Sequence, residues 1–518
     1  MQEKFLSLVV EAIGMLEGMN EVSGEINDNI EKYYKSMSVL EQENCMNIIE
    51  EALGEDDKLF FYCMTYLMKT IKDVSVMKRV LYYISAKNIA TNTKDSLLFQ
   101  TVFELFVNSE KYEYKSVYSD IMGVYEGILG EVLNVIGPSA NFDVVDIKDN
   151  KKIVIMLEPM LSEYHAPTRL MVNMYYYLQN LGYEPVVFAG SKKNLHISNS
   201  MFCYANRFNN SAMEETAKFK VKYFDVEVQG AHLNYTVPQY YNDILTGLNY
   251  IYNEKPLMVI SIGGNNLLAD LCNIFTKVAV MGTTNHMPIT VSDNIIRYFK
   301  CTEEKIKEYE ELKTNMQKII QINWKGAKIL EDRDENLSRA TYGIGEDAFV
   351  ICIAGNRLDF EIDNAMLKVI EEIIGKDEKI TVMFVGDCAL LKGKIVSSES
   401  AKQCVFTGFT DYFRQVLGMA DIIINPPRQG GGGVGTVAVE KGIPVITLGN
   451  CDVSSVVGEE FVCGDISEMP YLVDRYRNDK EFYEKQRAMC LKRSKSNVDI
   501  NKSEENIACM IKEIIGTV

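Results

Sequence analysis

The sequence predicts an α/β protein in which two Rossmann-like, doubly wound domains follow an all-helical N-terminal domain. Residues 1–150 show only helical spacing of apolar residues, whereas from Lys151 onward apolar runs typical of buried strands alternate with helical segments. This alternation starts again near Phe349. We therefore expect a helical domain at 1–150, α/β domains at 151–330 and 331–490, and a C-terminal helix at 491–518.

Composition narrows the class of protein. The chain has 518 residues, 47% of them hydrophobic, and a net charge of -18, which argues against a general nucleic-acid binder. We expect no signal peptide, and no apolar run approaches the ~20 residues that a membrane span needs. The twelve cysteines form no CxxC pair and no cluster with histidines. We expect a cytoplasmic protein with reduced cysteines and no metal site.

The helical domain carries clear local signals. Apolar residues of the first segment follow helical spacing from Phe5 to Leu16, and Ser38 with Glu41 forms a capping-box signature before the next apolar face. A domain of this kind packs against the rest of the chain or recognises something. Oligomerisation or binding of a partner subunit through it is a further expectation.

The first α/β domain opens with a βαβ unit, in which a strand at 153–157, a helix at 168–181 and a strand at 185–189 follow one another. Further strands are expected at 257–262 and 278–281, with a helix at 269–275 between them. A long charged helix is expected at 303–320.

The second α/β domain repeats the pattern. Strands are expected at 349–354, 380–385, 405–406, 422–425 and 445–448, with helices at 363–374 and 412–419 and a helical final segment. Ligands of such sheets bind beyond the carboxyl ends of the strands. We therefore expect the site in a cleft between the two α/β domains.

The glycine run is the most informative motif. Gly430, Gly431, Gly432 and Gly433 follow the apolar stretch 421–425 and precede a helix that ends at Gly442. A loop without side chains admits a ligand to the backbone, and the free N–H groups at a helix start favour phosphate. A flexible surface loop is the alternative.

The same glycines satisfy a dinucleotide fingerprint. Gly430, Gly432 and Gly435 match GxGxxG, and Asp452 stands about where an acid that binds ribose is expected. However, that fingerprint normally occupies the first βα turn of its domain, whereas here about three βα units precede the run. The late position favours another diphosphate ligand.

Three segments together resemble the donor half of GT-B glycosyltransferases, the superfamily that includes glycogen synthase-like and O-GlcNAc transferase-like enzymes. They are 349–358, 406–426 and 430–448, which includes Gly442-Ile443-Pro444-Val445-Ile446. The resemblance implies transfer of a sugar from a nucleoside diphosphate sugar, with a UDP-sugar as the expected donor and no required cofactor or metal. The helical domain ahead of the two α/β domains resembles protein-modifying members, which implies a protein or glycan acceptor. The acidic charge and the lack of a long apolar run predict no nucleic-acid partner and no transmembrane segment.

The motif departs from the superfamily at three positions. Gln429 and Val437 stand where many retaining members have acidic residues, and Glu361 lies where a basic residue often follows the first loop. Ribose recognition by the usual route is therefore in doubt. Asp452 or Glu440 could serve instead, or catalysis has been lost.

Candidate donor residues follow from charge and position. Arg357 and Arg428 could bridge phosphate oxygens with their guanidinium groups, although a salt bridge to Asp359 or Glu361 is the alternative. Thr436, near the start of the helix, could offer its hydroxyl and N–H to a phosphate or act only as a cap.

Candidate acceptor-side residues lie in loops that face the cleft. His165, after the first strand, suits a general base near neutral pH, and a helix-capping role is the alternative. Glu158 shares this loop. Gly263, Gly264 and Asn265 form a turn after another strand, and His286 lies in a polar cluster near a strand end.

Two other classes of function remain open. One is a non-catalytic glycosyltransferase-like subunit that binds a protein substrate, which Gln429 and Val437 motivate. The other is a nucleotide-sugar epimerase or NAD-type enzyme with two Rossmann-like domains.

Overall fold

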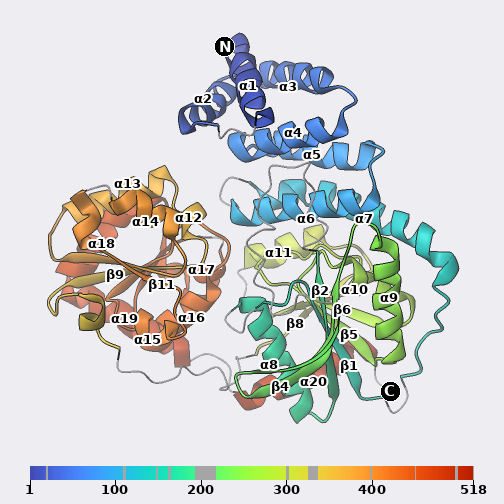
Figure 1. Cartoon of the computed structure of the whole chain (residues 1–518). Coiled ribbons are helices and arrows are strands. Elements are labelled where there is room, and N and C mark those ends of the chain that lie inside the picture. Colours follow the sequence, from blue (N-terminus) through green and yellow to red (C-terminus); the bar gives the residue numbers. More distant parts are fainter. Residues whose placement is uncertain are drawn as a thin grey trace.

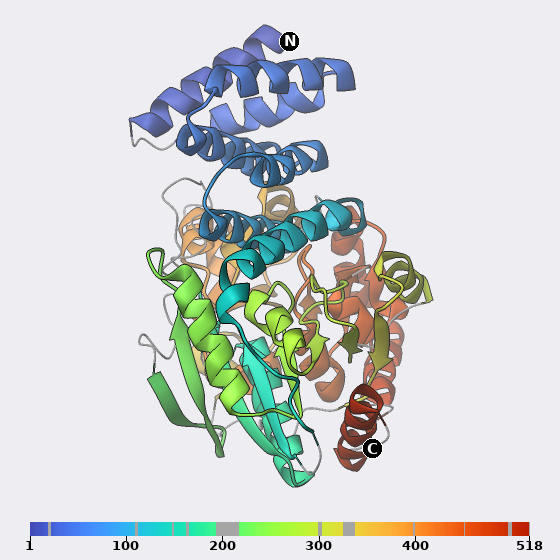
Figure 2. The ribbon, with the colours of Figure 1, turned by 90° about the vertical axis from the view of Figure 1, so that its right-hand side faces the viewer.

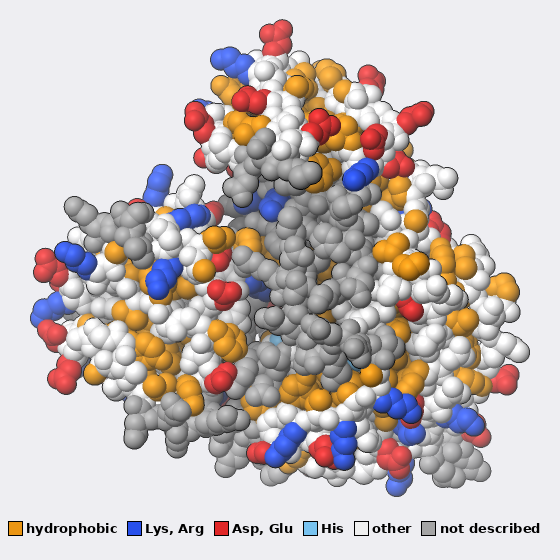
Figure 3. Space-filling view, viewed as in Figure 1, with side chains coloured by type: hydrophobic (Ala, Val, Ile, Leu, Met, Phe, Trp, Pro, Cys, Tyr) orange, Lys and Arg blue, Asp and Glu red, His pale blue; other side chains and the backbone are white. Residues whose placement is uncertain are grey.

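The computed structural model describes residues 1–18, 22–108, 112–147, 150–161, 165–192, 217–298, 303–324, 337–396, 399–449, 451–495 and 500–516. Figure 1 shows three parts: a helical domain at the top, a first α/β domain at the lower right and a second at the left. On the face in Figure 3, the described basic and acidic side chains are interspersed over both α/β domains. Within the described residues, no helix is both long and apolar enough to cross a membrane.

The N-terminal domain is built of helices, as the sequence predicts. In its described part these are α1 (Gln2–Glu17), α2 (Gly24–Lys35), α3 (Val39–Leu53), α4 (Asp57–Ile71), α5 (Val74–Ala86), α6 (Thr91–Val107) and α7 (Tyr114–Ile136). The predicted capping box is present: the Ser38 hydroxyl accepts from the Glu41 N–H, and the Glu41 carboxylate accepts from the Ser38 N–H at 2.9 Å. Figures 1 and 2 show α6 and α7 as the layer nearest the α/β domains.

The first α/β domain contains an eight-stranded sheet in the order β3-β4-β2-β1-β5-β6-β7-β8, in which only β3 runs antiparallel to its neighbour. The strands are β1 (Lys152–Leu157), β2 (Glu184–Ser191), β3 (Ala217–Tyr223), β4 (Val226–Asn234), β5 (Met258–Ile262), β6 (Lys277–Met281), β7 (Asn294–Arg297) and β8 (Lys318–Gln321). The helices are α8 (Ala166–Asn180), α9 (Tyr240–Asn253), α10 (Leu267–Leu271) and α11 (Glu303–Leu312). The four strands predicted here are confirmed, while β3, β4, β7 and β8 were not foreseen.

The expected long helix at 303–320 is wrong. Helix α11 ends at Leu312, and Lys318–Gln321 forms strand β8, which pairs in parallel with β7. The Gln317 amide between them donates to the carbonyls of Thr290 and Ser292, at 3.0 and 3.2 Å. Pairing with the sheet edge therefore overrides the helical charge pattern of this segment.

The second α/β domain has a six-stranded sheet in the order β11-β10-β9-β12-β13-β14. The strands are β9 (Phe349–Ala354), β10 (Ile380–Val385), β11 (Cys404–Gly408), β12 (Ile422–Ile424), β13 (Val445–Leu448) and β14 (Val462–Cys463). The helices are α12 (Leu358–Glu361), α13 (Asn364–Gly375), α14 (Ala389–Val396), α15 (Phe413–Leu417), α16 (Gly432–Lys441), α17 (Asp452–Val457), α18 (Met469–Asn478) and α19 (Lys480–Lys495). Numbered within the domain, this is the 3-2-1-4-5-6 order of a doubly wound sheet. Every strand predicted for the domain is present.

The C-terminal helix returns to the first α/β domain. Helix α20 (Ile500–Ile515) packs against α8, and its residues Ile507 and Ile511 are buried in the same apolar cluster as Ile155 of β1. The Asn180 amide donates to the Glu504 carboxylate at 2.9 Å. The expected boundary at 490 falls inside α19, and the one at 330 lies outside the described residues.

The helical domain packs onto the carboxyl-terminal edge of the first sheet. The Tyr125 hydroxyl of α7 donates to the Asp270 carboxylate at 2.6 Å, and the Tyr118 hydroxyl donates to the Pro288 carbonyl at 3.1 Å. Apolar residues of both domains form one continuous cluster. Helices α6 and α7 therefore cover the edge where ligands of parallel sheets bind.

Candidate functional site

The two arginines of the second domain lie at its topological switch point, where β9 and β12 are neighbours but their connections leave in opposite directions. Arg357 follows β9 and is the N-cap residue of α12, whereas Arg428 follows β12. The carboxyl ends of these strands meet, which brings the two side chains to one place although they are far apart in the sequence. This is the standard ligand position in an open α/β sheet.

Glu361 holds both arginines. Its carboxylate lies 2.9 Å from Arg357 Nη2 and 3.0 Å from Arg428 Nη1. Burial would raise the pKa of Glu361, but the charges of Arg428 and Arg357 lower it. The salt bridge considered as the alternative role is thus present for both arginines. The three side chains together still carry one net positive charge.

Arg428 is a buried cation whose hydrogen bonds are nearly complete. Its Nε group donates to the Asn425 side chain at 2.7 Å and its Nη1 group to Glu361. Its Nη2 group is buried and has no hydrogen-bond partner among the described residues. Arg428 therefore contributes positive potential and one unused donor group at the base of the glycine loop.

The glycine run forms the loop between β12 and α16 and the first turn of that helix. Gly431 is the N-cap residue, with a φ of 98°, and α16 begins at Gly432. Within the described part of the chain, the N–H groups of Gly430 to Gly433 donate no hydrogen bond. These donors lie at the positive end of the helix dipole, an arrangement that is chemically suited to an anion.

Most of these glycines are required by neighbouring side chains. A Cβ atom on Gly430 would lie 3.1 Å from Arg357 Nη2 and 3.6 Å from Phe106, and one on Gly431 would lie 2.9 Å from the Arg428 guanidinium. A Cβ on Gly432 would lie 3.3 Å from the Asp452 Cβ. Only at Gly433, within this run and among the described atoms, would a Cβ meet nothing within 4 Å. The lack of side chains in the run thus lets the guanidinium groups of Arg357 and Arg428 lie close to the backbone N–H groups of the glycines.

Thr436 does not stand at the helix start. Because α16 begins at Gly432, Thr436 lies in the second turn, and its hydroxyl donates to the Gly432 carbonyl at 3.0 Å. The expected phosphate contact from its N–H group is wrong, because that group lies inside the helix. Val437 is buried in the apolar core of the domain, and Gln429 is buried beside the loop.

Asp452 links the two α/β domains. It is the first residue of α17, it is buried, and its carboxylate accepts from the Asn285 backbone N–H of the first domain at 3.0 Å. Burial raises the pKa of Asp452 to about 7, although Asn285 and Arg357 oppose this. Asp452 therefore lies beside the glycine loop, but one of its oxygens is already used between the domains.

His165 lies at the switch point of the first domain, between β1 and β5. It is the N-cap residue of α8 and makes no side-chain cap; its Nδ1 atom lies 3.3 Å from the Thr168 hydroxyl. Burial, with a smaller effect of the Arg357 charge, lowers the pKa of His165 to about 4. The imidazole is therefore neutral at pH 7.

Glu158, directly after β1, faces the helical domain. Burial raises the pKa of Glu158 to about 7, with Asp95 adding to the effect and Lys192 opposing it. Lys192 pairs with Asp95 of α6 at 2.8 Å. One Glu158 oxygen, Oε1, has no hydrogen-bond partner among the described residues. It can accept a proton or a hydrogen bond from a ligand.

The turn after β5 is tightly packed. Gly263 has a φ of 100°, and a Cβ on Gly264 would lie 2.6 Å from the Ile289 nitrogen, so both positions require glycine. Asn265 is 8% exposed, and neither polar atom of its side chain has a partner among the described residues. The Asn265 side chain therefore has polar groups that the described residues leave for a ligand.

His286 lies beneath the helical domain. Its ring stacks on Tyr114 of α7, with centroids 4.3 Å apart, and Lys305 Nζ lies 3.2 Å from its Nδ1 atom. Burial lowers the pKa of His286. The side chain therefore takes part in the contact between domains.

A residue of the helical domain that the sequence did not point to lies against Arg357. The guanidinium carbon of Arg357 lies 4.3 Å from the centroid of the Phe106 ring, and Phe106 belongs to α6. A phenylalanine at helical spacing usually indicates a core position. No local signal in the sequence relates it to an arginine about 250 positions later.

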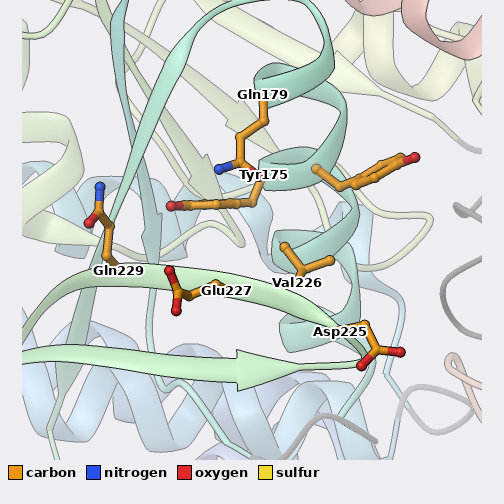
Figure 4. Close-up of a pocket in the computed structure, with 7 residues that line it drawn as sticks. Tyr175, Gln179, Asp225, Val226, Glu227 and Gln229 are labelled. Atoms are coloured by element: carbon orange, nitrogen blue, oxygen red, sulfur yellow. The ribbon is translucent and has the colours of Figure 1, made fainter.

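A separate pocket lies away from these residues. It is lined by Tyr175, Tyr176 and Gln179 of α8 and by Asp225, Val226, Glu227 and Gln229 of the β3–β4 hairpin. Figure 4 shows Tyr175 and Gln179 on the helix facing Glu227 and Gln229 on the strand. This is the amino-terminal end of β4, at the sheet edge opposite the carboxyl ends of the parallel strands. Among the described residues, no group of three His, Cys, Asp or Glu side chains could hold a metal ion.

Comparison with known proteins identifies the fold. The chain matches no protein-family model and no curated protein sequence. An apo structure of OtsA has a TM-score of 0.50 at 11% identity, covering 71% of this chain and 100% of that one. Anabaena HepE with UDP-glucose has 0.49 at 10% identity, covering 70% of this chain and 99% of that one.

A mutant O-GlcNAc transferase from Thermobaculum terrenum has a TM-score of 0.47 at 10% identity and covers 99% of this chain and 98% of that chain. At these identities the likeness concerns the fold alone. The chain has the GT-B fold with a helical N-terminal domain, as its sequence predicts.

Proposed function

We propose that the protein is a glycosyltransferase that moves a sugar from a nucleoside diphosphate sugar to an acceptor hydroxyl group. One observation carries the proposal: the free N–H groups of Gly430 to Gly433 begin α16 beside Arg357, at the switch point of the second domain in a GT-B fold. Negative charge grows on the diphosphate as the sugar leaves. Backbone donors, the helix dipole and a guanidinium group stabilise that charge without reorganisation.

The acceptor would bind from the side of the first domain. His165 is neutral at neutral pH and close enough to Arg357 for its pKa to be affected, so we propose it as the base for the acceptor hydroxyl. Glu158 is the second candidate, because its pKa is near 7 and one of its oxygens is unused by the described residues. Asn265 would orient the acceptor through its unused amide.

Calorimetry with UDP, GDP, ADP and NAD tests the donor site. We expect the protein to bind UDP, and Arg357→Ala to weaken that binding by about tenfold or more, since a charge-assisted hydrogen bond contributes roughly 1.5–3 kcal/mol. Lys379→Ala is the matched control, because it removes one positive charge from an exposed pair at the opposite edge of the same sheet. Equal affinity of the two variants would remove Arg357 from the site.

A non-catalytic partner subunit is the alternative that the structure favours most. Val437, at the position where many relatives by fold contact the ribose, belongs to the apolar core, and Gln429 is uncharged and buried. Under this alternative the protein binds a nucleotide or a protein but turns over no donor. A screen of labelled sugar donors with protein and glycan acceptors distinguishes a glycosyltransferase from a non-catalytic subunit. Only a catalytically active protein would transfer the sugar or hydrolyse the donor.

An NAD-type enzyme or nucleotide-sugar epimerase is tested in the same titrations. The glycine run follows β12, the fourth strand of its domain, rather than the first strand, where the dinucleotide fingerprint belongs. Tight binding of NAD would nevertheless support this class.

A further inference from the structure

Phe106 brings the helical domain into contact with the proposed donor site. The residue lies in the last turn of α6, and its ring centroid is 4.3 Å from the guanidinium carbon of Arg357. The position of a Cβ on Gly430 would be 3.6 Å from the edge of the same ring. Phe106, Arg357 and Gly430 therefore meet, although they come from two domains.

The contacts with Glu361 and Phe106 constrain the side chain of Arg357. A guanidinium group donates hydrogen bonds in its plane and stacks through its faces. Glu361 accepts a hydrogen bond from Nε of Arg357 at 3.0 Å and lies 2.9 Å from its Nη2 atom, while the Phe106 ring lies beneath the guanidinium carbon. Among the described residues, Nη1 has no hydrogen-bond partner. The remaining edge is thus left for a ligand.

Helix α6 is itself anchored to the first α/β domain. Asp95 accepts from Lys192 at 2.8 Å and from the Tyr240 hydroxyl at 2.9 Å, and both contacts are buried. The Tyr241 hydroxyl and the Thr91 hydroxyl are 2.9 Å apart. Because α6 is held on one α/β domain and touches the other through Phe106, its position sets the surroundings of Arg357.

We propose that Phe106 is a positioning residue for the donor phosphates, which makes the helical domain a structural part of the donor site as well as a platform for an acceptor or partner. This inference rests on the proposed function of Arg357. The ring holds the guanidinium plane so that its free edge is presented to the diphosphate before the ligand arrives.

The test compares aromatic with aliphatic substitutions in the full-length protein. We expect Phe106→Leu to weaken UDP binding about threefold to tenfold, and Phe106→Tyr to bind within about twofold of the wild type, because the cation–π contact needs an aromatic face. Phe349→Leu, which changes a partly buried phenylalanine at the amino-terminal end of β9, is the size-matched control. Thermal unfolding of each variant checks that it is folded. If Phe106→Leu does not fold, Phe106→Met takes its place as the aliphatic variant.

A double-mutant cycle distinguishes positioning from packing. In an Arg357→Ala background, Phe106→Leu should change UDP affinity by less than about twofold, since the residue acts through the arginine. An equal loss in both backgrounds, or full affinity in the Phe106→Leu single variant, overturns the inference. If the wild type binds no nucleoside diphosphate at all, the proposed function itself fails, and this result is distinct from the other two.

Discussion

Arg428 donates to the Glu361 carboxylate at 3.0 Å, and both side chains are almost entirely buried at the base of the glycine loop. The pair ties the loop after β12 to α12, which also carries Arg357. The buried ion pair between Arg428 and Glu361 thus fixes the position of the loop and of Arg357 in the proposed donor site.

Breaking this pair should be strongly destabilising. Glu361→Gln leaves Arg428 buried without its carboxylate, and we expect the free energy of unfolding to fall by about 3–5 kcal/mol. Urea denaturation followed by circular dichroism measures the change. Glu440→Gln, which breaks the more exposed pair with Arg414, should cost about 1 kcal/mol or less. Similar losses in the two variants would contradict a structural role for the buried pair.

The buried carboxyl group of Asp452 should make stability depend on pH. Its pKa is about 7 in the folded protein against 3.8 ordinarily, so this group costs stability as pH rises from about 4 to about 7, and by a constant amount above that. Asp452→Asn lacks this cost and keeps an acceptor for the Asn285 N–H group. We expect the variant to gain stability over the wild type across this window, by up to about 4 kcal/mol.

Unfolding measured at pH 5 and at pH 8 checks this expectation. Glu459→Gln, which removes an exposed carboxylate near the end of α17, is the control and should show no comparable dependence. A stability gain at Asp452→Asn that is the same at both pH values would show that the carboxyl group does not titrate in this range.

Two neighbouring glycines should respond oppositely to alanine. Gly431 has a φ of 98°, and its added Cβ would lie 2.9 Å from the Arg428 guanidinium, so Gly431→Ala should destabilise the protein by about 2 kcal/mol or more. Gly433 lies in the first turn of α16 and faces open space, so Gly433→Ala should be neutral or stabilising by up to about 1 kcal/mol. Thermal unfolding of the matched pair measures both; equal destabilisation would refute the packing described for Gly431.

The pH dependence of transfer should identify the base. With His165 as the base, kcat/KM should fall only below about pH 5, because the pKa of His165 is about 4. His165→Ala should lower kcat about 10²- to 10⁴-fold. A profile with an apparent pKa near 7 that disappears in Glu158→Gln would instead assign the role to Glu158.

The local pattern of apolar residues was sufficient to predict many of the strands. The strands 380–385 and 445–448 have the predicted bounds, because short apolar runs between turn residues leave few alternatives. Strands such as β8 could not be predicted, because they form only where a neighbouring strand is available. Thr436 was misplaced for a related reason: glycines are poor helix formers, yet α16 begins within the run.

The sequence by itself determined that two doubly wound domains follow a helical one, and that a glycine run precedes a helix in the second. These features follow from the spacing of apolar residues and from the residue types at helix starts. Both depend on residues that are near one another in the sequence. Only the tertiary structure decided what those glycines contact. Phe106, Arg357, Arg428 and Asp452 meet the run through contacts between distant segments, because the carboxyl ends of strands β9 and β12 converge under α6.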